Sequence, residues 1–151
     1  MSSVSERKHI PNRLYKRIFS VVPRLCVDLL IIENDCILLT KRRDNPGKGY
    51  WHIPGGRVIY GERLREAIKR KASEEINIEV EKSNLVHIHE YPLKYSVGHD
   101  ISLCYLVKSK GSIKETSNMK FFSRRPKELF PTQDQIISRI KLNNNVLKNF
   151  K

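Results

Sequence analysis

Apolar residues recur at intervals of three and four in the middle of the chain, which predicts a helix with one buried face. The positions on this face are Leu64, Ala67, Ile68 and Ala72. We expect the helix to begin near Glu62, after a loop at Gly55-Gly56 whose glycines permit backbone angles closed to other residues. The acidic residues of the segment lie off this apolar face, namely Glu62, Glu66, Glu74 and Glu75.

Other segments predict two more helices and several strands. A short helix is expected over residues 13–21, and a last helix from Thr132, where T-x-x-Q is a capping-box pattern. This last helix would bury Ile136, Ile137 and Ile140. Strands are expected at 25–32, 36–41, 86–91, 100–108 and 119–122. A Glu-Asn-Asp turn separates the first two strands, which predicts a hairpin.

Length and composition predict a single domain over residues 1–151, with basic, partly flexible ends at 1–12 and 142–151. Three cysteines at unrelated spacings, each in an apolar run, favour reduced core thiols over a disulfide framework or a zinc site. The first 24 residues are too polar for a signal peptide, and polar residues interrupt the apolar run at 25–39. We therefore expect no membrane segment and a cytoplasmic location.

The net charge of +13 is concentrated at the two ends of the chain. Residues 1–24 hold six basic and one acidic residue, and residues 118–151 hold eight basic and two acidic residues. Such ends can attract polyanions, so nucleic acid is considered as a substrate or partner. The basic runs lack interleaved aromatics and any recognised nucleic-acid motif, and binding to nucleic acid is therefore not favoured.

Two adjacent carboxylates, Glu74 and Glu75, lie near the end of the predicted central helix. Two such groups repel each other unless cations lie between them, and hard oxygen ligands suit Mg²⁺ or Mn²⁺. Pairs of this kind are usually solvated helix surface. The preceding Gly-Gly loop is what favours a metal site here.

The pattern G-x5-E-x7-R-x3-E-E falls on Gly56, Glu62, Arg70, Glu74 and Glu75. By this pattern the segment resembles the Nudix box of hydrolases that cleave nucleoside diphosphates linked to another group. The resemblance implies an α+β fold, the Nudix fold, with a mixed β-sheet sandwiched between helices. It also implies that Glu74, Glu75 and the carbonyl of Gly55 bind the metal, while Glu62 and Arg70 form a supporting ion pair.

Two positions depart from this family pattern. Lys71 stands where the family has Glu, and Asn77 stands where it has Gly. Asn tolerates the left-handed conformation, so Asn77 can still end the helix. Lys71 lies three and four residues before the paired carboxylates and can pair with either of them. We therefore expect weaker metal binding and fewer bound ions.

The flanking sequence is similar to the GDP-mannose mannosyl hydrolase branch of the family. The pattern K-R-x3-P-x2-G-Y-W-x2-P-G-G-R-V occupies residues 41–58. By this resemblance Arg42 and Arg57 face the diphosphate, where a guanidinium fork can bind two oxygens. Asp28 matches an acid near the sugar. Related enzymes are often dimers, so a homodimer is an open alternative.

The general base is the least defined part of the expected site. In the branch a histidine follows a glutamine ligand in a loop, but residues 113–122 contain no histidine. Glu115 falls at the ligand-like position and Thr116 at the base-like one, so Glu115 is either a third metal ligand or the base. With Arg42 and Arg70 it completes the predicted catalytic set. Other candidates for the base are His52, His87, His89 and His99.

Three functions remain open from the sequence. The favoured one is a Mg²⁺-dependent hydrolase of a nucleoside diphosphate derivative, such as a GDP-sugar, with water attacking either the anomeric carbon or a phosphorus. The second is a Nudix domain that binds nucleotide or a partner protein without catalysis, which Lys71 supports. The third is an enzyme that acts on RNA ends, which the basic ends support.

Overall fold

The computed structural model describes residues 10–93 and 98–142, and within them three helices and eight strands are found. The helices are α2 (Asn12–Phe19), α3 (Leu64–Ile76) and α4 (Gln133–Leu142). The strands are β1 (Arg24–Leu30), β2 (Ile32–Glu33), β3 (Cys36–Lys41), β4 (Trp51–His52), β5 (Gly55–Arg57), β6 (Val80–Glu90), β7 (Asp100–Ser109) and β8 (Met119–Phe122).

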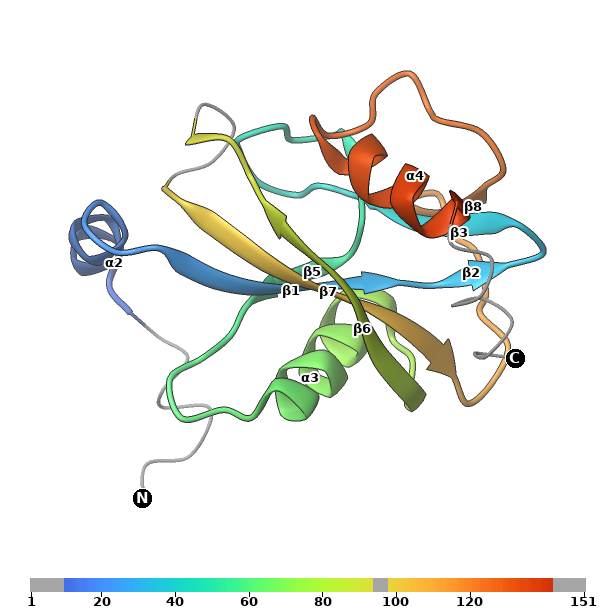
Figure 1. Cartoon of the computed structure of the whole chain (residues 1–151), viewed down its shortest axis with the longest axis horizontal. Helices are drawn as coiled ribbons and strands as arrows, with labels where there is room; N and C mark the ends of the chain where they lie inside the picture. Colours follow the sequence, from blue (N-terminus) through green and yellow to red (C-terminus); the bar gives the residue numbers. More distant parts are fainter. Residues whose placement is uncertain (1–9, 94–97, 143–151) are drawn as a thin grey trace.

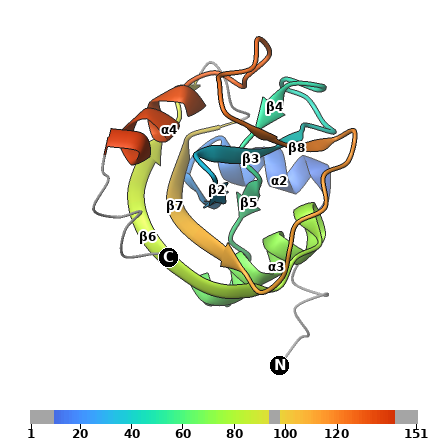
Figure 2. The ribbon, with the colours of Figure 1, turned by 90° about the vertical axis from the view of Figure 1, so that its right-hand side faces the viewer.

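The strands form two four-stranded sheets that lie between α3 and α4 (Figure 1). The first sheet has the order β5-β1-β7-β6 and is mixed, because β1 runs parallel to β7 while the other pairs are antiparallel. In the second sheet β3 pairs with β2, β4 and β8. Figure 2 shows β6 and β7 curving around one side of the molecule, from α4 to α3. The expected mixed sheet between helices is confirmed.

Two apolar clusters hold the helices on opposite faces of the strands. Leu29 points to the cluster that contains Ala67, Ile68 and Ala72 of α3. The next residue, Leu30, points to the cluster that contains Ile136 and Ile140 of α4. This alternation follows from the two-residue period of a strand. It makes β1 the common support of both helices.

The predicted hairpin is present, but its first strand is not β1. The chain leaves the first sheet after Leu30, and the two-residue strand β2 then pairs with β3. The turn at Asn34 and Asp35 has φ of 50° and 60°, the positive values that tight hairpin turns require. The apolar run at 25–32 therefore covers two strands in two different sheets.

Several boundaries differ from the sequence expectation. The box helix begins at Leu64, so Glu62 lies before it, and β6 starts six residues before the predicted 86–91. The expected capping box at Thr132 is absent, because this residue has φ of 70° and its hydroxyl bonds His89 Nε2 at 3.2 Å. Residues 1–9 and 143–151, most of the ends predicted to be flexible, lie outside the described residues.

The cysteines form no disulfide among the described residues. Cys104 is buried, Cys26 and Cys36 are half-buried, and all three thiols are free, as expected. Among the described residues, no helix has the length and apolar character needed to cross a bilayer.

Candidate functional site

A buried ion pair fixes the loop before α3. Arg70 Nε lies 2.6 Å from Glu62 Oε1, and the Glu62 side chain is only 2% exposed. The same carboxylate accepts the backbone N–H of Ile59 at 3.0 Å, while Arg70 donates to the carbonyl of Arg57 at 2.9 Å. The expected ion pair between Glu62 and Arg70 is thus present. It joins the end of β5 to the middle of α3.

The paired carboxylates at the end of α3 both face cations of the same helix. Lys71 Nζ lies 2.8 Å from Glu75 Oε1 and 3.6 Å from Glu74 Oε2. Arg70 Nη1 lies 3.3 Å from Glu74 Oε2. The structure therefore contains the pairing that the departure at Lys71 predicted. The helix ends as expected at Asn77, which has φ of 51° and ψ of 47° in the left-handed region.

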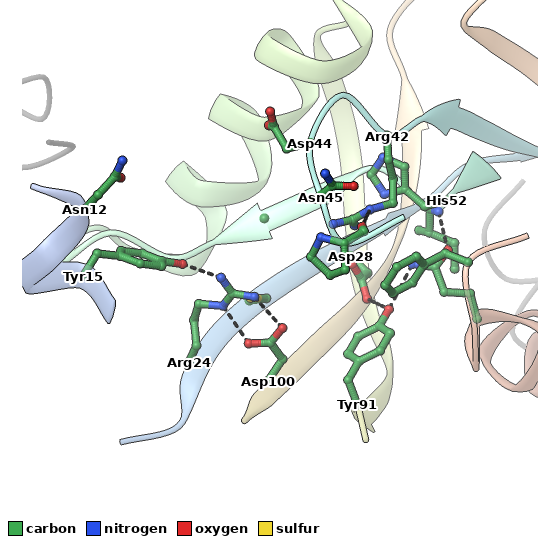
Figure 3. A pocket seen from close by; sticks show the side chains of 17 residues that line it. Asn12, Tyr15, Arg24, Asp28, Arg42, Asp44, Asn45, His52, Tyr91 and Asp100 are labelled. Carbon is green, nitrogen blue, oxygen red and sulfur yellow. Dashed lines mark hydrogen bonds and ion pairs between the residues drawn. The ribbon is translucent and has the colours of Figure 1, made fainter. Parts of the chain in front are cut away.

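A cavity of about 510 Å³ opens beside the Gly-Gly loop (Figure 3). The predicted site residues that line it are Asp28, Arg42, Gly55 and Gly56, together with the candidate base His52. Other predicted site residues do not line this cavity, namely Arg57, Arg70, Glu74, Glu75 and Glu115. The Lys71 side chain, which pairs with Glu74 and Glu75, lies against Gly56 at the edge of this cavity.

A chain of hydrogen bonds forms the wall of the cavity at Asp28. Tyr91 donates its hydroxyl to Asp28 Oδ2 at 2.8 Å and accepts from Gln133 Nε2 at 3.1 Å. Gln133 Oε1 in turn accepts the backbone N–H of Ile53 at 2.7 Å. Burial raises the pKa of Asp28 to about 6, although the bond from Tyr91 acts to lower it. A carboxyl group in this state can hold or release a proton near neutral pH.

Arg42 is held in the cavity by its own loop and by an aromatic ring. Its Nε donates to the carbonyl of Pro46 at 2.7 Å, and its guanidinium lies 4.4 Å from the ring centre of Phe130. Burial lowers the pKa of Arg42 from its ordinary value, and the charge of nearby Arg24 acts in the same direction. Arg24 also lines this cavity but is paired with Asp100, so Arg42 is the guanidinium that we expect to meet an anionic ligand there.

The N-terminal helix supplies a second wall that the sequence analysis missed. Tyr15 accepts a hydrogen bond from Arg24 Nη1, and Arg24 forms a bidentate pair with Asp100 at 2.6 and 2.5 Å. All three line the cavity with Asn12, and Figure 3 shows Arg24 between Tyr15 and Asp100. Arg57 instead places its guanidinium over the rings of Tyr15 and Phe19, at 5.7 and 5.8 Å.

The histidine candidates separate into one cavity residue and three others. His52 lines the cavity and bonds Thr40 Oγ1 at 3.2 Å. Burial and the charge of Arg42 lower the pKa of His52 to about 3, so its ring is neutral at pH 7. His87, His89 and His99 do not line the cavity, and His99 lies 2.8 Å from Glu90 Oε1.

Glu115 lies in the loop before β8 and bonds the backbone. Its Oε1 accepts the N–H of Phe121 at 2.7 Å, and the next residue, Thr116, closes a turn with Met119. In the described part of the chain, no three His, Cys, Asp or Glu side chains come together as a metal-binding group. Glu115 is therefore not clustered with Glu74 and Glu75 here.

The donor set of α3 nevertheless fits a magnesium ion. Glu74 and Glu75 are about 31% and 30% exposed, so both carboxylates are accessible to solvent. Mg²⁺ is usually bound by one or two carboxylates, with water and substrate phosphates completing its octahedron. Two adjacent carboxylates next to the Gly55 loop match this pattern, with Lys71 as a cation that competes for them.

Comparison with known proteins tests the family and the fold. A model of the NUDIX domain matches residues 22–142, which covers β1 to α4 and excludes α2. The fold resembles the MutT NUDIX hydrolase from Burkholderia pseudomallei, with a TM-score of 0.70 and 24% identity over 79% of this chain and 98% of that one.

Two curated relatives resemble parts of the chain. An ADP-ribose pyrophosphatase from Methanocaldococcus jannaschii is 35% identical over 85 residues, which are 56% of this chain and 50% of the relative. The low-salt glycan biosynthesis protein Agl8 from Haloferax volcanii is 38% identical over 71 residues, 47% of this chain and 46% of the relative. The chain thus spans about half the length of the curated relatives it matches. Because the domain match covers most of the chain, the protein belongs to the Nudix family.

Proposed function

We propose that this protein is a Mg²⁺-dependent hydrolase of a nucleoside diphosphate linked to another group, with a GDP-sugar as the first candidate substrate. The observation that carries the proposal is the placement of Arg42 and Asp28 in one cavity beside Gly55 and Gly56. Lys71, which pairs with Glu74 and Glu75, lies against Gly56 of that loop. A diphosphate at the loop would then have metal-binding carboxylates on one side and a guanidinium on the other.

The names of the two relatives support the substrate class. One is an ADP-ribose pyrophosphatase, and the other is a glycan biosynthesis protein. Both names are compatible with a substrate in which a nucleoside diphosphate carries a sugar. The GDP-mannose-like pattern at residues 41–58 favours the sugar nucleotide among these derivatives.

In the proposed mechanism the chain binds the diphosphate and controls charge around it. Glu74, Glu75 and the Gly55 carbonyl would hold Mg²⁺, which neutralises charge on the leaving phosphates when it is bound. Arg42 would bind diphosphate oxygens, and its position against Phe130 limits its freedom. Arg70 would act by holding the loop through its contacts to Glu62 and the Arg57 carbonyl.

Asp28 is the proposed acid–base group at the linked moiety. Its carboxyl lies in the cavity with a pKa that burial raises to about 6, so both protonation states are populated near neutral pH. The ionised form would stabilise positive charge at an anomeric carbon, and the same form could accept a proton from the attacking water. The second role would serve attack at phosphorus equally well.

A second candidate function is a Nudix domain that binds nucleotide without turnover. The contact of Lys71 with Glu75 at 2.8 Å favours it, since an ammonium group occupies the carboxylates that would hold the metal. In that case the cavity would still bind a diphosphate through Arg42. Binding without product formation is the behaviour that separates this function from the first.

The test is an incubation with Mg²⁺ and a panel of GDP-, ADP- and UDP-sugars, dinucleotides and nucleoside triphosphates, with products identified by mass. Free sugar plus nucleoside diphosphate would mean attack at carbon, and nucleoside monophosphate plus sugar phosphate would mean attack at phosphorus. Arg42→Ala should reduce kcat/KM on the best substrate by about 100-fold. Arg43→Ala is the matched control, because Arg43 is exposed and does not line the cavity. Absence of turnover with every substrate, together with nucleotide binding, would favour the second function.

A further inference from the structure

Lys71 lies between the paired carboxylates and the loop that borders the cavity. Its Nζ is 2.8 Å from Glu75 Oε1 and 3.6 Å from Glu74 Oε2. Only 12% of its side chain is exposed, although lysine is a surface residue in most proteins. The group is thus held in place on α3.

The loop accommodates Lys71 because residue 56 is glycine. A Cβ at position 56 would lie 2.7 Å from Lys71 Cε and 2.9 Å from Nζ. The end of the lysine side chain therefore lies directly on the backbone of Gly56, which also lines the cavity. The ammonium group contacts the carboxylates on one side and the cavity loop on the other.

The charges around this position limit how many cations the helix can attract. The connected groups are Glu62, Arg70, Lys71, Glu74 and Glu75. Three carboxylates and two cations give this cluster a net charge of −1. A glutamate at position 71 would change the net charge to −3. Each divalent ion adds two positive charges. The cluster with Lys71 therefore favours one bound ion, whereas a cluster with glutamate at position 71 tolerates two.

We propose that the Lys71 ammonium is a built-in cation of this site, which takes the place of one divalent ion at Glu75 and limits the helix to a single bound ion. The proposal rests on the proposed function only in that Glu74 and Glu75 bind a divalent ion. A fixed ammonium needs no ion from solution, and it keeps positive charge next to the loop at Gly56.

Manganese binding without any substrate tests this inference. Mn²⁺ titrations followed by electron paramagnetic resonance give the number of bound ions and their affinity for the full chain and its variants, each checked for folding by circular dichroism. The variants are Lys71→Arg, Lys71→Met and Lys71→Glu. The matched controls are Lys69→Met and Lys69→Glu, because Lys69 is an exposed residue of the same helix.

We expect one Mn²⁺ for the unchanged protein, for Lys71→Arg and for both Lys69 variants. Lys71→Met should bind its ion about tenfold more tightly, because it removes the competing charge. Lys71→Glu should bind a second ion. The inference is overturned if Lys71 and Lys69 variants bind Mn²⁺ alike, if no variant binds Mn²⁺, or if the unchanged protein already binds two ions.

This result separates the inference from the proposed function. If the Lys71 variants show the expected binding while no substrate of the panel is hydrolysed, the inference stands and the hydrolase proposal fails. If substrate is hydrolysed but Mn²⁺ binding is the same in the Lys71 and Lys69 variants, the hydrolase proposal stands and the inference fails.

Discussion

Tyr91 donates its hydroxyl to Oδ2 of Asp28 at 2.8 Å, and both groups are buried. The bond connects the residue directly after β6 with the middle of β1. Asp28 is 6% exposed, so its carboxylate has lost most of its contact with water and depends on such partners. The bond therefore lies at a position where protonation and stability are coupled.

The first prediction concerns the pH dependence of stability. Burial raises the pKa of Asp28 from 3.8 to about 6, so the folded protein binds more protons at this residue than the unfolded chain between these values. The contribution of Asp28 to the free energy of unfolding should therefore fall by about 3 kcal/mol as the pH rises through this window. Below about pH 4 both states are protonated and the penalty is absent.

Asp28→Asn removes this titration while keeping an oxygen that can accept from Tyr91. We expect the free energy of unfolding of the variant, relative to the unchanged protein, to increase by about 3 kcal/mol between pH 4 and pH 7. Urea unfolding at several pH values measures it. Parallel stability profiles over this range would contradict the prediction.

The second prediction concerns the ion pair between Glu62 and Arg70. Burial acts to raise the pKa of Glu62, but the hydrogen bond and charge of Arg70 outweigh it and lower the pKa below 4.5. The stabilising contribution is therefore present above the ordinary pKa and is lost as the pH falls through the lowered one. Glu62→Gln should reduce the free energy of unfolding at pH 7 by about 3 kcal/mol, because it removes the nearest carboxylate from Arg70 and leaves only the longer contact to Glu74 at 3.3 Å.

The control for Glu62→Gln is Glu79→Gln, which removes an exposed pair. Glu79 lies 3.4 Å from Lys110, and both side chains are more than half exposed. Its loss should cost less than about 1 kcal/mol. Equal costs for the two substitutions, measured by urea unfolding, would show that the buried pair does not anchor the loop.

Much of the box helix could be predicted from local spacing, since the apolar positions of α3 recur at helical intervals. The ion pair between Glu62 and Arg70 was expected from the family resemblance, because Glu62 lies before the helix and helical spacing does not pair it with Arg70. The pairing of Lys71 with Glu75 follows from helical spacing, because residues four apart are neighbours on a helix.

The cavity wall could not be predicted, since it depends on contacts between distant segments. Tyr91 and Gln133 are 63 and 105 positions from Asp28, and nothing in their neighbourhood indicates that they meet it. Of these residues, Gln133 could have been recognised from the sequence, because a polar residue beside the apolar positions of α4 suggests a buried hydrogen-bond partner. The change of sheet after Leu30 was missed for the same reason, since the apolar run continues through it.

The third prediction concerns Asn77, where the family pattern has glycine. Asn77 is exposed and left-handed, with φ of 51°, and a side chain at such a position is strained. Asn77→Gly should raise the free energy of unfolding by about 0.5 kcal/mol, while Asn77→Ala should lower it by about 1 kcal/mol. Thermal or urea unfolding of the two variants measures this order. If Asn77→Ala were as stable as Asn77→Gly, the left-handed backbone at position 77 would carry no energetic cost for a residue with a side chain.

The fourth prediction contrasts the two glycines of the loop. A Cβ at Gly55 would lie 2.2 Å from the backbone oxygen of Val27 and 2.7 Å from Asp28 Oδ1. The three atoms nearest to a Cβ at Gly56 all belong to the end of the Lys71 side chain, which can move. Gly55→Ala should therefore cost about 3 kcal/mol of stability, whereas Gly56→Ala should cost less than about 1 kcal/mol.

Urea unfolding of Gly55→Ala and Gly56→Ala measures the two costs side by side. Because Gly56→Ala displaces Lys71, it should also tighten Mn²⁺ binding in the direction expected for Lys71→Met. Gly55→Ala should not tighten Mn²⁺ binding, since its contacts are with Val27 and Asp28 and its carbonyl is a proposed metal ligand. Equal losses of stability would contradict the steric argument. If Gly56→Ala left the Mn²⁺ affinity unchanged, Lys71 would keep its contact with Glu75 even when an alanine Cβ fills the space beside it.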